Sequence, residues 1–401
     1  MVGNENTGEI LKDQVISIMK MLIKSVICNE PVDKNLIATI SPDVLRQLYL
    51  LSNKHDLAHM VAYALKQENA LGHDEVSELF YKSIYVAVAR HTRIVTEQKK
   101  ICDVLEKNRI VHVPLKGAEI RDYYPEAWLR TSCDIDILIR REEVKGAEEC
   151  LIRELNYRRG HNNYHDISFY SESGVHLELH FSILENDRRI DGMLQTVWEH
   201  LESIEGYKYR RCMEPAYFVF YQMAHAMHHF IYGGCGVRFL IDLWVINNKK
   251  FYNKEVSLSY YEQCGISIFC EELNHLVGVW FQGMQHSKTS EVMEKYILDG
   301  GVYGTKSNFI AATRSRTENS GRWNYWWRRV FVPYSTLASE KEKLRKQPIL
   351  YPYYLVKRWF KIFKLDMRKS LEREIKADYS LHPKKMSEVK ELFDELNLRK
   401  F

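Results

Sequence analysis

Residues 115–139 read LKGAEIRDYYPEAWLRTSCDIDILI, and the last six of them form a short apolar strand that carries Asp134 and Asp136. Side chains alternate across a strand, so both carboxylates are expected on one face and the intervening isoleucines on the other. Two neighbouring carboxylates repel each other and resist burial unless a cation lies between them, and Mg²⁺ prefers such oxygen ligands. The alternative is an edge strand with one solvated face, on which the two acids hold nothing.

A strand, a glycine turn and a helix are predicted upstream of this acidic pair. Residues 109–115 (RIVHVPL) read as a buried strand that runs into Lys116, Gly117 and Ala118, and the helical run AEIRDYY follows as far as Pro125. Such a turn offers backbone N–H groups to phosphate, and Lys116 would add a positive charge. A glycine at a strand-to-helix turn is also commonly just a steric requirement.

A third carboxylate is predicted downstream. Residues 175–181 (VHLELHF) alternate between apolar and polar side chains, which places Glu178 on one face together with His176 and His180. Paired with residues 167–170 in a hairpin, this strand would lie beside the one that carries the two aspartates. Glu178 is preferred as the third acid because apolar residues flank it.

Other polar residues of this region have competing interpretations. Asp166 and Glu185 are alternative third acids. For His176 and His180, a solvated or hydrogen-bonded sheet face is favoured over contact with a substrate.

The order of these motifs resembles the nucleotidyltransferase superfamily that includes polymerase β, and more closely the bacterial uncharacterised nucleotidyltransferases of the NTP_transf_5 type. The resemblance rests on Leu-Lys-Gly-Ala, Tyr124-Pro125, Arg130, Asp134-Ile-Asp136 and Glu178, taken in that order. It implies an α+β fold, in which a small mixed β-sheet forms the core between N-terminal and C-terminal helical regions. Here Ala118 stands where many members have Ser.

The corresponding hypothesis is a Mg²⁺-dependent enzyme of the EC 2.7.7 type, which moves an NMP group from an NTP, such as ATP, to an acceptor hydroxyl with release of pyrophosphate. Asp134 and Asp136 would hold one or two Mg²⁺ ions, and Glu178 would complete the metal site or take the hydroxyl proton. The triphosphate would lie over Lys116, Gly117 and Ala118. Arg130 would steady the charge that develops on the phosphate oxygens.

Composition indicates a soluble cytoplasmic protein of several substructures. Hydrophobic residues make up 45% and charged residues 27% of the 401 residues, and a net charge of +4 is too small to imply a nucleic-acid partner. The 8 cysteines are scattered without a CxxC pair, as in a reducing cytosol. The polar start of the sequence is unlike a signal peptide, and no transmembrane segment is expected.

Four parts are expected along the chain. They are an N-terminal helical region (residues 1–95), the nucleotidyltransferase core (96–204), a helical domain that closes over the site (205–320) and a basic aromatic C-terminal helical tail (321–401). In the first part, His55 and His59 are expected as a pair on a helix surface rather than as metal ligands.

The helical domain contains a His-rich helix that Pro215 begins and Gly233-Gly234 ends. His225 and His229 share a face of it, and zinc binding is the less favoured alternative because no HExxH pattern is present. Arg238 and Asp242 are spaced for an ion pair within the next helix.

The tail mixes aromatic and basic residues with few acids, which suits an anionic membrane surface, a lipid-linked acceptor or a nucleic-acid backbone. Packing of the aromatics on the body of the protein is the favoured alternative. The aromatic and basic residues of the tail are Trp323, Tyr325, Trp326, Trp327, Phe331, Tyr351, Tyr353, Tyr354, Trp359, Phe360 and Phe363, with Arg328, Arg329, Lys343, Arg345, Lys346, Lys357, Arg358, Lys361 and Lys364.

Two other classes of function remain as alternatives to the transferase. They are an NTP-binding regulatory or toxin–antitoxin component and an RNA-binding protein. The acceptor of the proposed transfer is open: a small molecule, saccharide, protein or RNA.

Overall fold

The computed structural model describes residues 2–249, 252–302, 304–316, 321–340, 342–361 and 365–399. Phe363 and Lys364 of the expected tail lie outside these residues. The chain forms two compact units, of which unit 1 comprises Met1–His225 with Val237–His286, and unit 2 comprises Ala226–Gly236 with Ser287–Phe401. The four-part division expected from the sequence remains a prediction.

Unit 1 contains most of the helices and all of the strands. Its helical segments are α1 (Val2–Cys28), α2 (Lys34–Ala38), α3 (Pro42–Lys54), α4 (Ala58–Gln67), α5 (Glu75–Lys107), α6 (Gly117–Ile120), η1 (Arg121–Tyr123), η2 (Ala127–Leu129), η3 (Arg141–Glu143), α7 (Val144–Leu155), α8 (Arg188–Leu194), η4 (Val197–Glu199), α10 (Arg238–Lys249), α11 (Lys254–Cys264) and α12 (Ser267–Phe281). Its strands are β1 (His112–Pro114), β2 (Asp134–Ile139), β3 (Arg158–Asn162), β4 (Asp166–Tyr170), β5 (His176–His180), β6 (Leu201–Ser203) and β7 (Arg211–Met213).

Helix α9 (Pro215–Ile231) contributes to both units, because the boundary falls inside it. It begins at Pro215 and is followed by Gly233 and Gly234, both at positive φ, as predicted. The segments of unit 2 are α13 (Lys288–Gly300), α14 (Lys306–Ser315), α15 (Arg322–Val330), α16 (Tyr334–Glu340), α17 (Glu342–Lys346), η5 (Pro348–Leu350), α18 (Tyr351–Lys361), α19 (Leu365–Ser380) and α20 (Pro383–Glu395). Among the described residues, none of the helices has the length and apolar character needed to cross a bilayer.

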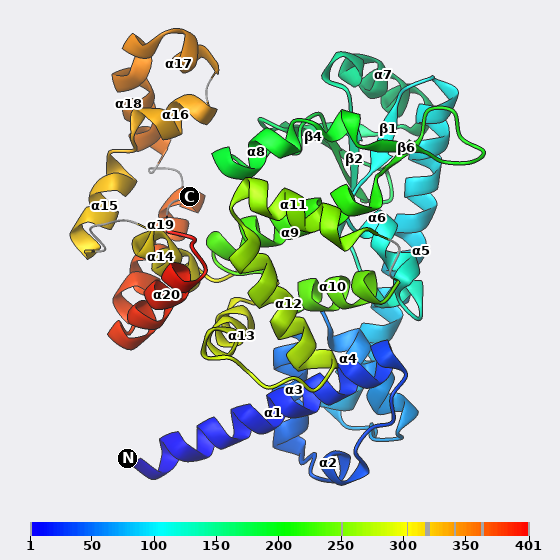
Figure 1. Ribbon diagram of the computed structural model, residues 1–401, viewed down its shortest axis with the longest axis vertical. Helices are drawn as coiled ribbons and strands as arrows, with labels where there is room; N and C mark the ends of the chain where they lie inside the picture. Colours follow the sequence, from blue (N-terminus) through cyan, green and yellow to red (C-terminus); the bar gives the residue numbers. More distant parts are fainter. Residues whose placement is uncertain are drawn as a thin grey trace. The chain divides into compact units, whose positions relative to one another are not determined.

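Unit 1 contains a five-stranded mixed sheet in the order β1-β2-β5-β4-β3. Figure 1 labels β1, β2 and β4 of this sheet. β2 and β5 run parallel, and every other neighbouring pair runs antiparallel. The hairpin of β4 and β5 and the α+β fold class are confirmed. β3 was not expected, because its sequence RRGHN is entirely polar and exposed. A separate two-stranded sheet joins β6 and β7.

One face of the five-stranded sheet packs into an apolar core of unit 1. Ile135, Ile137, Leu177 and Leu179 are buried on it, packed with residues of α5 and α7. Complete burial of such a side chain contributes about 1.5–3 kcal/mol. Since side chains alternate, this packing leaves the even-numbered residues of β2 and β5 on the opposite face.

The N-terminal helices differ from expectation at one point. The helix expected to carry both His55 and His59 is interrupted between α3 and α4, where Asp56 adopts φ +53°. His55 and His59 are therefore not an exposed helix-surface pair. Both are buried, and a ring nitrogen of His59 lies 2.9 Å from the carbonyl oxygen of Leu129.

A buried ion pair ties the segment before β2 to α10. Arg130 donates from Nε to Asp242 Oδ1 (2.8 Å) and from Nη2 to Oδ2 (2.9 Å), and the Tyr124 hydroxyl donates to the same carboxylate (2.6 Å). The expected intrahelical pair of Arg238 with Asp242 is thus replaced. Arg238 lies 3.5 Å from Asp56 instead.

Loss of this ion pair should strongly destabilise unit 1. Arg130→Met leaves the buried carboxylate of Asp242 uncompensated, and we expect it to lower the free energy of unfolding by about 3–5 kcal/mol in urea titrations. Adding Asp242→Leu should restore much of the loss, because no buried charge then remains.

The matched control is Lys99→Met, which removes an exposed pair with Asp103 and should change stability by less than about 1 kcal/mol. If Arg130→Met were no less stable than this control, the claim that the variant leaves a buried carboxylate of Asp242 without a counter-charge would be wrong.

Candidate active site

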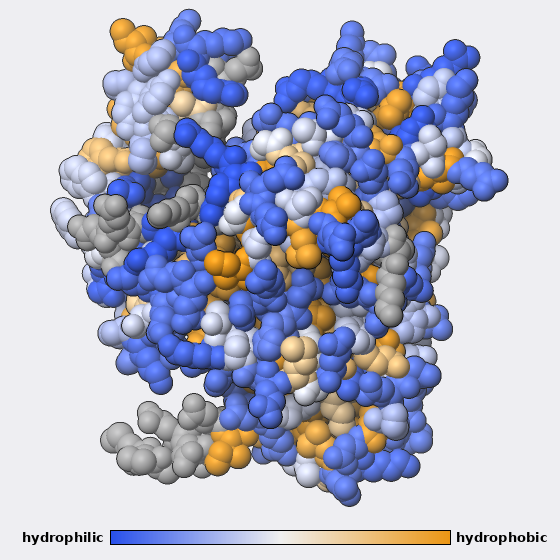
Figure 2. All heavy atoms as spheres, viewed as in Figure 1, coloured by the Kyte–Doolittle hydropathy of each residue, from blue (hydrophilic) through white to orange (hydrophobic). Residues whose placement is uncertain are grey.

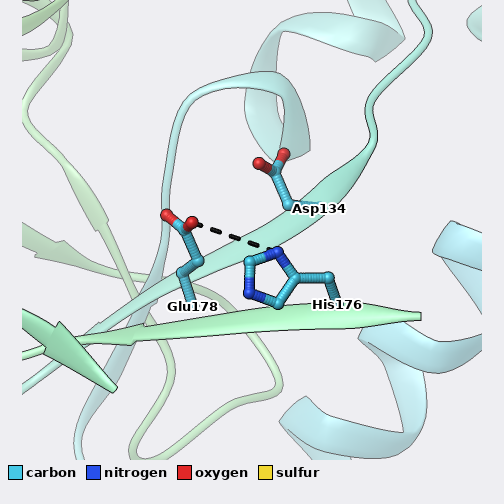
Figure 3. Close-up of side chains that lie close together, drawn as sticks. All are labelled: Asp134, His176 and Glu178. Atoms are coloured by element: carbon cyan, nitrogen blue, oxygen red, sulfur yellow. Dashed lines mark ion pairs between the residues drawn. The ribbon is translucent and has the colours of Figure 1, made fainter. Parts of the chain in front are cut away.

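Three carboxylates gather on the polar face of the sheet. Asp136 of β2 is directly paired in register with Glu178 of β5, and Asp134 is paired with His176. Figure 3 shows the side chains of Asp134, His176 and Glu178 rising from the two adjacent strands on the same side of the sheet. The predicted neighbourhood of the three acids is therefore observed, and their role stays a prediction.

Two cationic side chains offset the charge of Asp136. Its Oδ1 accepts hydrogen bonds from Lys116 Nζ (3.0 Å) and His180 Nε2 (2.9 Å). Burial alone would raise the pKa of the Asp136 carboxyl, but Lys116 and His180 hold it well below its usual range. Burial likewise opposes protonation of His180, yet its hydrogen bonds to Asp136 and Glu178 raise its pKa to about 9. His180 thus has the hydrogen-bonded sheet position that the sequence favoured.

Asp134 is less well compensated than Asp136. Burial, followed by repulsion from Asp136, raises the pKa of Asp134, whereas the hydrogen bond from His180 lowers that of Glu178. The His176 Nδ1 atom lies 4.0 Å from Glu178 Oε1 (Figure 3). The face therefore carries excess negative charge at Asp134, which is the condition under which a bound cation is most favourable.

Among the described residues, two overlapping groups have ligand atoms close enough to share a metal ion. One is Asp134, His176 and Glu178, and the other is Asp136, Glu178 and His180; within each group these atoms lie within 4.8 Å of one another. His225 and His229 belong to neither. His225 Nδ1 instead lies 2.9 Å from Glu185 Oε1.

The alternative third acids have other neighbours. Glu185 is hydrogen-bonded to His225. Asp166 is buried opposite His180 on β4 and accepts a hydrogen bond from Asn163. Register and shared ligand distances therefore favour Glu178.

The turn between β1 and α6 is strained and tightly packed. Lys116 adopts φ +51°, which is unfavourable for a residue with a side chain and is found at sites that surrounding structure holds in place. At Gly117, an added Cβ would lie 2.7 Å from Ser132 Oγ and 3.2 Å from Arg130 Nη1. Only glycine fits there, and Lys116 is directed back to Asp136.

Two of the residues expected to contact phosphate already have partners within the protein, and their contact with phosphate stays a prediction. Ala118 donates its backbone N–H to the Leu115 carbonyl (3.2 Å), so this group is used within the turn, and α6 is only four residues long. Arg130 is committed to Asp242 and packs behind Gly117, where it supports the turn. Its partner lies 112 residues further along the chain, so no local sequence pattern could indicate the pair.

The helix-flanked mixed sheet and the carboxylates clustered on one face agree with the fold and site that the resemblance to nucleotidyltransferases implies. The chain belongs to the family described as uncharacterised nucleotidyltransferases, whose model matches residues 43–282. No curated protein and no solved structure matches it. Membership supports nucleotidyl transfer as the general activity.

The burial of the Glu119 carboxyl, in α6, leads us to expect that the stability of the protein depends on pH. Burial raises the pKa of Glu119 to about 8 from its ordinary value of 4.5, although Arg210 lies near enough to lower it. Between these values the folded state binds the extra proton, so the contribution of Glu119 to stability falls as the pH rises. Glu119→Gln should therefore stabilise the protein more at the upper end of this range than at the lower end.

Denaturant titrations across this pH range measure the difference, with Glu172→Gln, at an exposed position in the β4–β5 turn, as the matched control. If the free energies of unfolding of Glu119→Gln and wild type differed by the same amount at all pH values, the pKa of Glu119 would not be raised in the folded state.

Proposed function

We propose that this protein is a Mg²⁺-dependent enzyme that transfers an NMP group from an NTP to an acceptor hydroxyl and releases pyrophosphate. The observation that carries the proposal is the convergence of Asp134, Asp136 and Glu178 on one face of two paired strands. Family membership supports the general reaction. In the part of the chain that the structure describes, none of the 8 cysteines is in a disulfide, which is consistent with the reducing cytoplasm that we propose as its compartment.

The donor set fits a hard divalent ion. Asp134, Asp136 and Glu178 would hold it through carboxylate oxygens, the ligands that Mg²⁺ prefers. In the present structure Lys116 and His180 supply the positive charge at Asp136, which indicates that this face requires cations. When bound, Mg²⁺ would neutralise the phosphates and favour departure of pyrophosphate.

The side chains of the chain itself have distinct roles in the proposed reaction. The acceptor oxygen attacks the α-phosphorus, a new P–O bond forms, and the bond from the α-phosphorus to the bridging oxygen breaks as pyrophosphate leaves. Glu178, which is half-buried at this face, would accept the proton of the hydroxyl where Asp134 and Asp136 alone hold the ion. Lys116, at the edge of the same face, would bind a phosphate oxygen of the NTP as it leaves Asp136.

Removal of the carboxylates should abolish transfer without unfolding the protein. We expect Asp134→Asn and Asp136→Asn, singly, to lower kcat by about 10²–10³-fold, since each removes several kcal/mol of transition-state stabilisation. Transfer is followed by incubating the protein with each labelled NTP, Mg²⁺ and cell extract, and by identifying the product that gains the label.

Glu172→Gln, an exposed acid in the β4–β5 turn, is the control and should leave transfer unchanged. Full transfer by the Asp134→Asn, Asp136→Asn double variant would refute the site. NTP binding without any labelled product would instead favour a regulatory protein.

Metal removal provides a separate test. Transfer should be lost in excess chelator and return on addition of Mg²⁺, because the three carboxylates then regain their counter-ion. Mn²⁺ should likewise restore transfer, because carboxylate ligands suit it as they suit Mg²⁺. Undiminished transfer in chelator would exclude the proposed metal dependence.

A further inference from the structure

A row of aromatic side chains lies exposed on unit 2. Trp323 and Trp327, one turn apart on α15, are 80% and 53% exposed, and their rings are stacked with centroids 6.4 Å apart. The ring centroids of Trp327 and Phe331 are 4.3 Å apart, and those of Phe331 and Trp359 of α18 are 5.5 Å apart. The row therefore joins two helices into one surface.

The opposite side of α15 is firmly anchored, which fixes the direction in which the row points. Tyr325 donates its hydroxyl hydrogen to Glu374 Oε1 of α19 (2.6 Å), and Arg329 forms two hydrogen bonds to the same carboxylate. Trp326 Nε1 donates to Asp378 Oδ2 (2.8 Å). The aromatic residues of α15 are thus divided between a packed side and an exposed side.

Helix α18 extends the exposed surface. Trp359 Nε1 donates to the Val330 carbonyl (2.9 Å), which holds α18 against the end of α15. Tyr353, Val356 and Phe360, at helical spacing, form an exposed stripe, and Ile349 just before the helix is 88% exposed. Figure 2 shows pale and orange side chains among blue ones over the segments that Figure 1 labels α15 to α18.

This surface is also strongly basic. Residues 321–361 contain ten Lys or Arg and only two acids, a formal net charge of +8, whereas the rest of the chain is net negative. Two of the ten, Arg322 and Arg329, are paired with Asp378 and Glu374, which leaves +6. Arg328 of α15 and Lys357 of α18 are exposed. The buried acids Glu374 and Asp378 are paired with Arg329, Arg314 and Arg322, so they do not offset these exposed charges.

We propose that this aromatic–basic surface, formed by α15 and α18 with Phe331 and Ile349, docks the protein on an anionic lipid bilayer. Trp and Tyr favour the headgroup region, where their apolar rings are buried and their polar atoms stay hydrated. Neighbouring Lys and Arg side chains are attracted to anionic headgroups. Exposed aliphatic residues such as Ile349 and Val356 gain by entering a bilayer and offer no stacking surface to a nucleic-acid base, which favours lipid over RNA.

Vesicle flotation with the full chain tests the proposal. We expect binding to vesicles of phosphatidylcholine mixed with phosphatidylglycerol, little binding to phosphatidylcholine alone, and weakening as salt is raised. Trp323→Ser with Trp327→Ser should lower the partition coefficient by about tenfold or more, and should abolish a blue shift of tryptophan emission on binding. Arg328→Gln with Lys357→Gln should lower it by more than about tenfold.

The control is Tyr85→Ser with Lys145→Gln, which changes an aromatic and a basic residue exposed on unit 1 and should leave binding unchanged. Thermal unfolding verifies that each variant is folded, and the lipid and salt dependence of the wild-type protein is informative without any variant. Equal binding to neutral vesicles, no binding to either kind, or binding to labelled single-stranded RNA but not to vesicles would overturn the proposal. No NTP is present, so failure here is independent of the transferase proposal.

Discussion

Repulsion between like charges on one face of a small sheet is the constraint around which unit 1 is organised. The parallel pairing of β2 with β5 places Asp136 directly beside Glu178, with Asp134 two residues away on the same face. The arrangement persists because the other face of the same strands is buried in the apolar core. A slip of one residue in register would expose that core, so packing on one side holds the acids together on the other.

Two cationic side chains close to the acids offset this repulsion. Lys116 reaches Asp136 from a turn in which its own backbone is strained, and His180 reaches the same oxygen from β5. Arg130, fixed by Asp242, fills the space behind Gly117. The turn that carries Lys116 is therefore packed against a residue of a separate ion pair.

The sequence predicted the parts of this arrangement that follow a short period. Alternation over two positions was enough to place Asp134, Asp136, Glu178 and His180 on common strand faces, and the hairpin of β4 and β5 followed from the same pattern. Contacts between distant segments were out of reach, because no local pattern links Arg130 to Asp242 or buries His59 under the carbonyl of Leu129. The strand β3 was missed since its pairing, not its composition, makes it a strand.

Helix α5 has a consequence of a different kind. Its 33 residues extend for about 50 Å, and within unit 1 they pack first against α4 and later, through Ile94 and Ile101, against the core beneath the sheet (Figure 1). Each residue turns a helix by about 100°, so inserting or deleting one between these two contacts would rotate one of them away from its partner. Insertions and deletions in related proteins should therefore occur in loops, while the number of residues between the two packing contacts of this helix stays constant.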